Sequence, residues 1–425
     1  MTTALAYGRG KLQVEFEGLD VEVIQPDHRP GIADERSALC EALDHPIGAE
    51  PLSRWMRPNQ RICVTFTDLT RATPNERIIP VLLDYLERHG ARKDAIVLLN
   101  QLGTHRPNTR EELEVMLTPG VVRSYRVLNH DAESAEALTQ VGVTDDGTPA
   151  LINRHYVEAD LRIVTGFIEP HLFAGFSGGP KNVMPGIAGL ETVKSNHGYG
   201  HIADPNATFG KTHDNPVWAE MKRIALQAGK AFLLNVTLNN DRELTGVFAG
   251  DLLKSHEAGC DFVREAAMQR VAEPYDIVVT TNSGYPLDLN LYQTAKGIGA
   301  AARIVRRGGV IIVASECREG VPSDSAFDRL LKGASGPADL LRKLDAAEKS
   351  LPDQWQAQIQ ANCQLAAQIQ LYSSMSDEAV RSVHLEPCHD IAASVRKIAA
   401  GMKRPPRIAV LPYGPLTIPY LASQG

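Results

Sequence analysis

Several residues that can bind anions or move protons follow apolar runs in this sequence. Arg71 comes after the run 61–66, in the segment TDLTRATPN, which also holds Asp68 and Thr70. A helix is predicted to begin just after this segment, and the free backbone N–H groups of a helix N-terminus favour a negatively charged ligand. Arg71 would then clamp a phosphate or a carboxylate. A capped helix whose Arg pairs with a local Asp is an equally good interpretation of the segment alone.

Two histidines occupy similar positions after the next apolar runs. His105 follows the run 95–100 in QLGTHRPNTR, and His171 follows the run 161–166 in GFIEPHLFAGFSGGPKNVMPG. Imidazole titrates near neutral pH and is therefore suited to general acid–base catalysis. A single loop histidine is more often a hydrogen-bonding surface residue, so neither histidine decides the function by itself.

A loop of small residues then leads to Lys181. Gly178 and Gly179 lack a Cβ and let the backbone approach a ligand closely, and a lysine on such a loop can act as a point charge or a nucleophile. Pro180 breaks the GxxxxGK[ST] spacing, which disfavours a P-loop NTPase. The alternative interpretation is a structural turn.

His197 and His201 are four residues apart in ETVKSNHGYGH. This spacing would place both on one helical face as metal ligands, but Gly198 and Gly200 disfavour a continuous helix. No HExxH motif is present, so the segment gives little support for a zinc hydrolase.

The second half of the chain has one comparable segment, NSGYPLDLNLYQTAKG, after the run 276–281. If 288–297 is helical, Asp288, Tyr292 and Lys296 share a face, with Gln293 beside them. A Lys–Tyr pair at a cleft would suit a carboxylate. The alternative is an exposed helix with an acid near its start and a base near its end.

Apolar runs of strand length alternate with helical patterns along the chain, which predicts an α/β fold with mostly parallel sheets. Thr73 is expected to be a helix N-cap with Glu76 closing a capping box, and Thr109 and Glu112 are expected to form a second box. The strands are expected at 61–66, 95–100, 161–166, 276–281, 309–315 and 407–412.

The strands fall into two groups, which predicts two α/β lobes with an active-site cleft between them. We place the N-terminal lobe at 1–270 and the C-terminal lobe at 275–404, because the stretch around 269–275 reads as a linker. The tail 405–425 is expected to return to the first lobe.

Composition excludes several classes of protein. The 425 residues carry a formal net charge of -7 without a long basic run, which argues against a nucleic-acid partner. No secretory signal and no apolar run of membrane-spanning length are apparent. The six cysteines form no CxxC pair, as in a reduced, cytoplasmic protein. Oligomeric state is not indicated.

Taken together, the segments resemble the lactate racemase family of nickel-pincer nucleotide enzymes. The resemblance spreads over most of the chain and is most specific around Lys181. It rests on DLTRATP (68–74), GTHRPNT (103–109), EPHLFAGFSGGPKNVMPGIAG (169–189), SNHG (195–198), FAGD (248–251), GYPLDLNLYQTAKG (284–297) and PDQWQAQI (352–359).

The resemblance implies a cofactor and roles for the residues above. The cofactor is pyridinium-3-thioamide-5-thiocarboxylic acid mononucleotide with nickel, attached to Lys181, and His197 is the implied nickel ligand. His105 and His171 are the implied acid/base pair. The resemblance implies substrate binding by Arg71, Tyr292, Gln293 and Lys296. Our candidates for cofactor binding are Asp68, Thr70, Gly178 and Gly179.

The activity implied by the resemblance is racemisation or epimerisation of a 2-hydroxy acid by reversible hydride transfer, which makes the protein an isomerase. Other proteins would be needed to make and load the cofactor. Pro180 and Leu69 depart from the family pattern, so the individual 2-hydroxy acid is left open. The alternatives are an NAD-dependent 2-hydroxy acid dehydrogenase, for which a strand-linked GxGxxG is missing, and a non-catalytic nickel- or nucleotide-binding protein.

Overall fold

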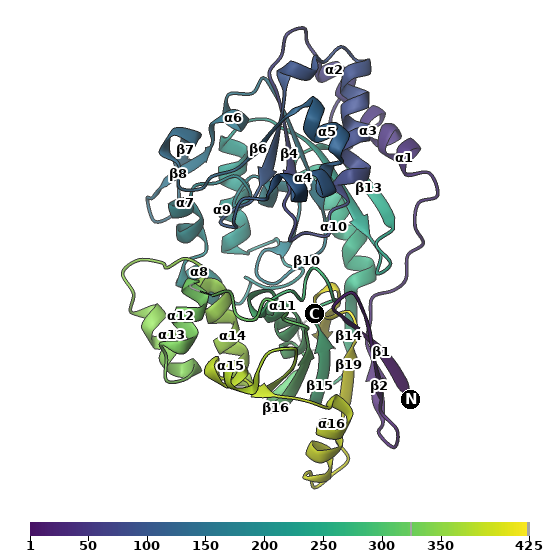
Figure 1. Ribbon diagram of the computed structural model, residues 1–425, viewed down its shortest axis with the longest axis vertical. Coiled ribbons are helices and arrows are strands. Elements are labelled where there is room, and N and C mark those ends of the chain that lie inside the picture. The colour runs from purple at the N-terminus through teal and green to yellow at the C-terminus, as the bar shows by residue number, and fades with distance from the viewer. Residues whose placement is uncertain (324, 423–425) are drawn as a thin grey trace.

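Two six-stranded sheets organise the chain in the computed structural model, which describes residues 1–323 and 325–422. Helices cover each sheet, and the two resulting lobes lie one above the other in Figure 1. The expected fold class, two α/β lobes with mostly parallel sheets, is confirmed.

The sheet of the first lobe is parallel except at one edge. Its strand order is β13-β12-β9-β4-β5-β6, and only β13 runs antiparallel to its neighbour. Every residue of β4 is buried, as expected of a central parallel strand covered on both faces. The strands are β4 (Ile62–Thr67), β5 (Ile96–Gln101), β6 (Arg126–Asn129), β9 (Leu161–Phe167), β12 (Phe232–Leu238) and β13 (Leu244–Asp251).

Helices and short hairpins complete the first lobe, and a separate apolar cluster packs on each face of its sheet. The hairpins are β7 (Leu138–Val143) with β8 (Pro149–Asn153) and β10 (Pro170–His171) with β11 (Gly175–Phe176). The helices are α1 (Glu35–Asp44), α2 (Leu52–Trp55), α3 (Asn75–Arg88), α4 (Arg110–Leu117), α5 (Pro119–Ser124), α6 (Arg154–Val157), α7 (Leu190–Asn196), α8 (Tyr199–Ala203), α9 (Pro216–Gln227) and α10 (Lys254–Ala267), with 3-10 turns η1 (Lys93–Ala95) and η2 (Ala135–Ala137).

The sheet of the second lobe is parallel throughout, in the order β18-β17-β16-β15-β19-β3. Its strands are β15 (Tyr275–Thr281), β16 (Val305–Ala314), β17 (Ala367–Tyr372), β18 (Glu386–Pro387), β19 (Ile408–Leu411) and β3 (Val21–Val23). The helices are α11 (Leu291–Ala302), α12 (Ala326–Lys332), α13 (Pro337–Asp345), α14 (Gln354–Ala366), α15 (Asp377–Ser382) and α16 (Ile391–Ala400).

The N-terminal residues belong with the second sheet, which differs from our placement of 1–270 in one lobe. β3 pairs in parallel with β19, and the hairpin of β1 (Thr2–Tyr7) and β2 (Gly10–Glu15) shares a buried apolar cluster with α16. Figure 1 shows this purple hairpin beside the lower lobe. β3 is a three-residue edge strand whose partner lies near the other end of the chain, so no local pattern reveals the pairing.

The C-terminal tail also differs from expectation. β19 is an inner strand of the second sheet, so residues 408–411 do not return to the first lobe. After the turn η4 (Gly414–Leu416), the strand β20 (Ile418–Leu421) pairs with β14 (Met268–Val271) at the junction of the lobes. Only Ile418 joins the apolar cluster built mainly by first-lobe residues.

One of the two expected helix caps forms. Thr109 and Glu112 make the reciprocal capping box of α4. Thr73 does not cap α3: the helix begins at Asn75 with Pro74 at the N-cap position, and the Thr73 hydroxyl is buried without a hydrogen-bond partner among the described residues. The expected box is wrong because Thr73 lies one residue before the N-cap.

The strand orders determine where ligands can enter. In the first sheet β4 lies between β5 and β9, and in the second sheet β15 lies between β16 and β19. Strands that come later in the chain therefore lie on both sides of β4 and of β15. A crevice at the carboxyl ends is expected at each such point. The described helices include none that is both long and apolar enough to span a membrane.

Phe16 gives a test of the N-terminal assignment. Its side chain is fully buried in the cluster that the hairpin shares with α16 and the second sheet. Phe16→Ala should therefore lower the free energy of unfolding by about 3–5 kcal/mol, measured by chemical denaturation. Leu226→Ala, at a largely exposed side chain, is the control and should change stability little. A Phe16→Ala protein as stable as this control would contradict the assignment.

Candidate active site

The segment after β4 supplies a buried carboxylate that organises its neighbours. Asp68 Oδ2 lies 2.8 Å from His105 Nδ1, the Thr70 hydroxyl donates to Asp68 at 2.9 Å, and Arg71 Nε lies 3.8 Å from Asp68 Oδ1. His105 comes from the loop after β5, so this contact joins the ends of two neighbouring strands. Asp68 and Thr70, expected near a cofactor, thus have hydrogen-bonding partners within the protein.

The charge on Asp68 fixes how His105 is protonated. Burial alone would raise the pKa of Asp68, but His105 and Arg71 hold the pKa of this carboxyl below its usual value. An ionised carboxylate only accepts hydrogen bonds, so Nδ1 of His105 carries the hydrogen. With the hydrogen on Nδ1, the lone pair of an uncharged ring lies on Nε2.

His171 has the opposite arrangement. It lies in β10 after β9, and its Nδ1 accepts a hydrogen bond from the backbone N–H of Ala174 at 3.2 Å. Burial and the nearby charge of Lys181 hold the pKa of His171 well below its usual value. The ring is therefore neutral at pH 7 with its hydrogen on Nε2.

The small-residue loop is packed against the protein itself. The Gly179 N–H donates to Asn235 Oδ1 at 2.8 Å, and a Cβ on Gly179 would lie 2.5 Å from the ring of His256. Gly178 has φ +80, and a Cβ there would lie 2.5 Å from Asn235 Oδ1. The close approach that requires glycine at these positions is to Asn235 and His256.

Lys181 lies in the 3-10 turn η3 (Gly179–Asn182) and lines the cavity described below. Burial, with Arg71 and Lys296 close by, lowers the pKa of its amine well below the usual value. A lowered pKa makes the neutral, nucleophilic form of this amine easier to reach.

His197 forms the C-cap of α7, and its Nδ1 is buried without a hydrogen-bond partner among the described residues. The ring lies edge-on to Phe173 at 5.0 Å and to Trp355 at 4.8 Å between centroids. Burial lowers the pKa of His197, which leaves it neutral. His201 is not on the same helix, because α7 ends at Asn196 and α8 begins at Tyr199.

The second lobe brings α11 to the same place. Tyr292, Gln293 and Lys296 line the cavity, as expected, and the Gln293 Oε1 atom is buried without a partner among the described residues. Asp288 is not on their face: the helix begins at Leu291, and the Asp288 carboxylate accepts the backbone N–H of Gly8 at 2.7 Å. The prediction of a helix over 288–297 placed its start three residues too early, because Asn290 is the N-cap of α11.

Two further residues of the site come from α14 and had no assigned role. Trp355 Nε1 donates to the Tyr292 hydroxyl at 2.9 Å, and Gln356 Nε2 donates to the Tyr292 backbone carbonyl at 2.7 Å. Because Trp355 also packs on His197, it connects α11 to the first lobe. The PDQW run was visible in the sequence, but nothing in it indicates contact with a tyrosine in α11.

These side chains surround one cavity of about 100 Å³ between the lobes. Three cations converge there, and burial together with Arg71 lowers the pKa of Lys296 to about 8. The lining includes Arg71, His105, His171, Gly178, Lys181, His197, Tyr292, Gln293, Lys296, Trp355 and Gln356.

Two family models match this chain. The model described as the lactate racemase N-terminal domain matches residues 7–210, and that of the lactate racemase C-terminal domain matches residues 271–418. The chain belongs to the lactate racemase family. It is accordingly an isomerase.

Relatives named lactate racemase match over almost the full length. The protein from Thermoanaerobacterium thermosaccharolyticum is 33% identical, with 96% of this chain and 97% of the relative covered. The protein from Lactiplantibacillus plantarum is 34% identical, with 89% and 90% covered.

Solved structures agree with the lactate racemase fold. The lactate racemase apoprotein from T. thermosaccharolyticum superposes with a TM-score of 0.92 at 32% identity, covering 99% of this chain and 100% of that chain. A protein from Thermotoga maritima matches with a TM-score of 0.70 at 20% identity, covering 91% and 98%, which supports the fold alone.

Asp68→Asn tests the Asp68–His105 contact in this lactate racemase family member. Because the folded-state pKa of Asp68 is lowered, its ionised form stabilises the fold above the unfolded-state pKa of about 4, and this contribution is lost as pH falls through the folded-state pKa. Chemical denaturation at pH 7 should show Asp68→Asn less stable by about 1.5–3 kcal/mol. The difference should narrow below a pH of about 4.

Asp20→Asn, at an exposed side chain, is the matched control and should match the wild type at both pH values. A stability difference for Asp68→Asn that is the same at low and neutral pH would contradict an ionised Asp68.

Proposed function

We propose that this protein racemises or epimerises a 2-hydroxy acid, with His105 and His171 as acid/base groups. The observation that carries the proposal is their convergence on one cavity with three cationic side chains, contributed by both lobes. An anionic substrate with an ionisable hydroxyl matches this combination of groups.

At rest, the two histidines would present different groups to a substrate oxygen: His105 a lone pair and His171 an N–H. His105 presents the Nε2 lone pair, because Asp68 holds its Nδ1–H. His171 presents an Nε2–H, because the backbone N–H of Ala174 occupies its Nδ1. His105 would take the hydroxyl proton of one enantiomer. Loss of the only hydrogen of a neutral ring would leave an imidazolate, so His171 would donate a proton from its imidazolium form when the opposite configuration is formed, and would otherwise donate a hydrogen bond from Nε2–H to the substrate oxygen. General acid–base catalysis of this kind contributes about 10²–10⁴-fold.

Arg71 and Lys296 would hold the substrate carboxylate. Their mutual repulsion is part of why the pKa of Lys296 is lowered to about 8. A carboxylate bound between them removes this repulsion and can accept two charge-assisted hydrogen bonds from the guanidinium. Tyr292 and Gln293 would contact the remainder of the substrate, and Trp355 would fix Tyr292 in place.

The residues present fit a lysine-tethered nickel-pincer nucleotide. The lowered pKa of Lys181 suits attachment through its amine, and the unpartnered Nδ1 and neutral ring of His197 suit a role as metal ligand. The described residues contain no group of three or more His, Cys, Asp or Glu side chains able to hold a metal ion. Nickel held here would thus take most of its ligands from the nucleotide.

When bound, this cofactor would supply a reversible hydride acceptor for the substrate α-carbon. We infer that other proteins make the cofactor and deliver it. Membership of an isomerase family favours this proposal over a dehydrogenase or a non-catalytic binding protein.

A panel of enantiopure 2-hydroxy acids tests the substrate class. Nickel-loaded enzyme should invert at least one member, followed by chiral chromatography, without added NAD. Keto-acid accumulation that requires free NAD would support the dehydrogenase instead. No inversion of any member by protein that carries the cofactor would contradict the proposal.

Substitutions separate the roles of the cavity residues. His105→Ala and His171→Ala should each lower kcat by about 10²–10⁴-fold while keeping the cofactor mass adduct. Lys181→Ala should lose both activity and adduct, seen by intact-protein mass spectrometry. The exposed Lys222→Ala is the control for Lys181 and should keep both. An adduct that survives Lys181→Ala would contradict tethering, and full activity in either histidine variant would contradict the acid/base assignment.

A further inference from the structure

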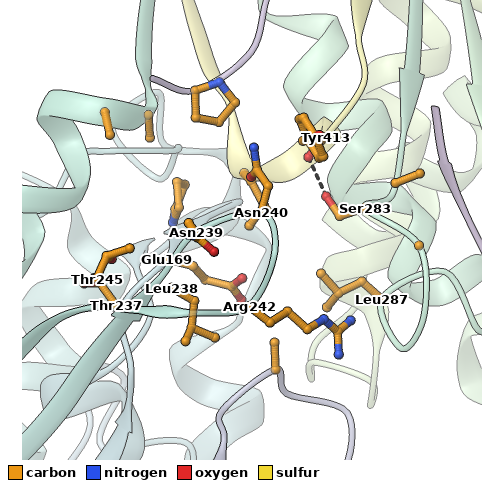
Figure 2. Close-up of a pocket in the computed structure, with 18 of the residues that line it drawn as sticks. Glu169, Thr237, Leu238, Asn239, Asn240, Arg242, Thr245, Ser283, Leu287 and Tyr413 are labelled. Atoms are coloured by element: carbon orange, nitrogen blue, oxygen red, sulfur yellow. Dashed lines mark hydrogen bonds between the residues drawn. The ribbon is translucent and has the colours of Figure 1, made fainter. Parts of the chain in front are cut away.

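A second, larger cavity lies between the lobes, apart from the catalytic one. It measures about 410 Å³ and shares only Phe167 with the lining of the catalytic cavity. The first lobe contributes the β12–β13 turn and part of α10, and the second contributes the 283–287 loop and the β1–β2 turn (Figure 2). We call it the hinge cavity. A molecule bound there would contact both lobes.

Cations without acidic partners line the hinge cavity. Arg9 stacks its guanidinium 3.8 Å from the centroid of the Tyr285 ring, and neither Arg9 nor Lys11 forms an ion pair within residues 1–323 and 325–422. Arg242, which has φ +63, donates to the backbone carbonyl of Tyr285 across the lobes. Arg29 also lines the cavity, but it pairs with Glu265 at 2.8 Å.

A buried acid lies in the wall of the same cavity. Glu169 is 8% exposed, and its carboxylate has no hydrogen-bond partner in the described part of the chain. Figure 2 shows its side chain among the residues that line the hinge cavity. The Glu169 oxygens are not among the fully enclosed side-chain atoms of the described residues, so they are accessible from the cavity. A ligand hydroxyl could therefore reach this carboxylate and donate a hydrogen bond to it.

The charges around Glu169 decide which donor suits it. Lys296, Arg71 and Lys181 lie close enough on the catalytic side to act electrostatically on this carboxylate. They would repel a ligand ammonium, so a neutral hydroxyl is the better donor. Arg9 and Lys11 line the cavity without an ion-pair partner among the described residues, and Asp27 is the other acid in the lining. A ligand that also carries an anionic group would be attracted by these two cations.

We propose that the hinge cavity is a second binding site, which takes a small hydroxylated carboxylate. Its carboxylate would bind Arg9, Lys11 and Arg242, and its hydroxyl would donate to Glu169. The site is separate from the catalytic cavity, and its ligand would brace one lobe against the other through contacts with both.

Titration calorimetry on cofactor-free protein tests the site with L-malate as the probe. The measurements use an Arg71→Gln background, which removes the carboxylate clamp of the catalytic cavity. Malate should still bind in this background, and Arg9→Gln/Lys11→Gln should weaken binding by about tenfold or more, which is about 1.4 kcal/mol. Arg123→Gln/Lys222→Gln removes two exposed cations elsewhere and should leave the affinity unchanged.

Succinate, which lacks the hydroxyl, and L-aspartate, which replaces it with an ammonium, test the contact with Glu169. Malate should bind more tightly than either, and Glu169→Leu should remove its advantage over succinate. If Glu169→Leu does not fold, the ligand comparison on the otherwise unchanged chain makes the same test.

Three results would overturn the proposal: equal affinity of the paired-cation variant and its control, succinate binding as tightly as malate, or aspartate binding more tightly than malate. None of these bears on racemisation, because the measurements use protein without cofactor. Loss of the racemase proposal would likewise leave malate binding at this site intact.

Discussion

Three cationic side chains in one buried cavity are the constraint around which this protein is built. Arg71, Lys181 and Lys296 lie near one another, with Asp68 and Glu169 as the nearby carboxylates. Water screens such repulsion less well inside a protein than at its surface, so part of it is relieved by lowering the pKa of both lysines. The same burial that makes the cations unfavourable makes the nucleophilic form of Lys181 easier to reach.

The architecture explains how such a cavity is assembled. Arg71, His105 and His171 follow β4, β5 and β9, three adjacent strands whose carboxyl ends share one edge of the first sheet. The second sheet faces them with α11, and α14 fixes that helix through Trp355 and Gln356. Each lobe holds only part of the site: Arg71 and Lys181 come from the first lobe, and Lys296 comes from the second.

The sequence predicted best the features that depend on residues close together in the chain. The capping box at Thr109 depends on neighbours a few positions away, and it was predicted correctly. Arg71, His105 and His171 also follow strands, as expected. Contacts between distant segments could not be predicted. Asp68 and His105 were both singled out, but their pairing needs β4 and β5 to be adjacent, and the Trp355–Tyr292 contact needs α14 to pack on α11. β3 is the extreme case, since its partner β19 lies almost at the other end of the chain.

The partner of each Nδ1 atom gives His105 and His171, the two histidines of the proposed mechanism, different properties, although both rings are of the same type. A carboxylate beside His105 stabilises the imidazolium that forms when Nε2 takes a proton, whereas the backbone N–H and buried cations beside His171 oppose a positive charge on it. An imidazolium at His171 would therefore release its proton readily. In the proposed reaction, which runs in both directions, a substrate carboxylate bound by Arg71 and Lys296 would have a second effect: its negative charge would offset part of the positive charge around His171 and make that ring easier to protonate.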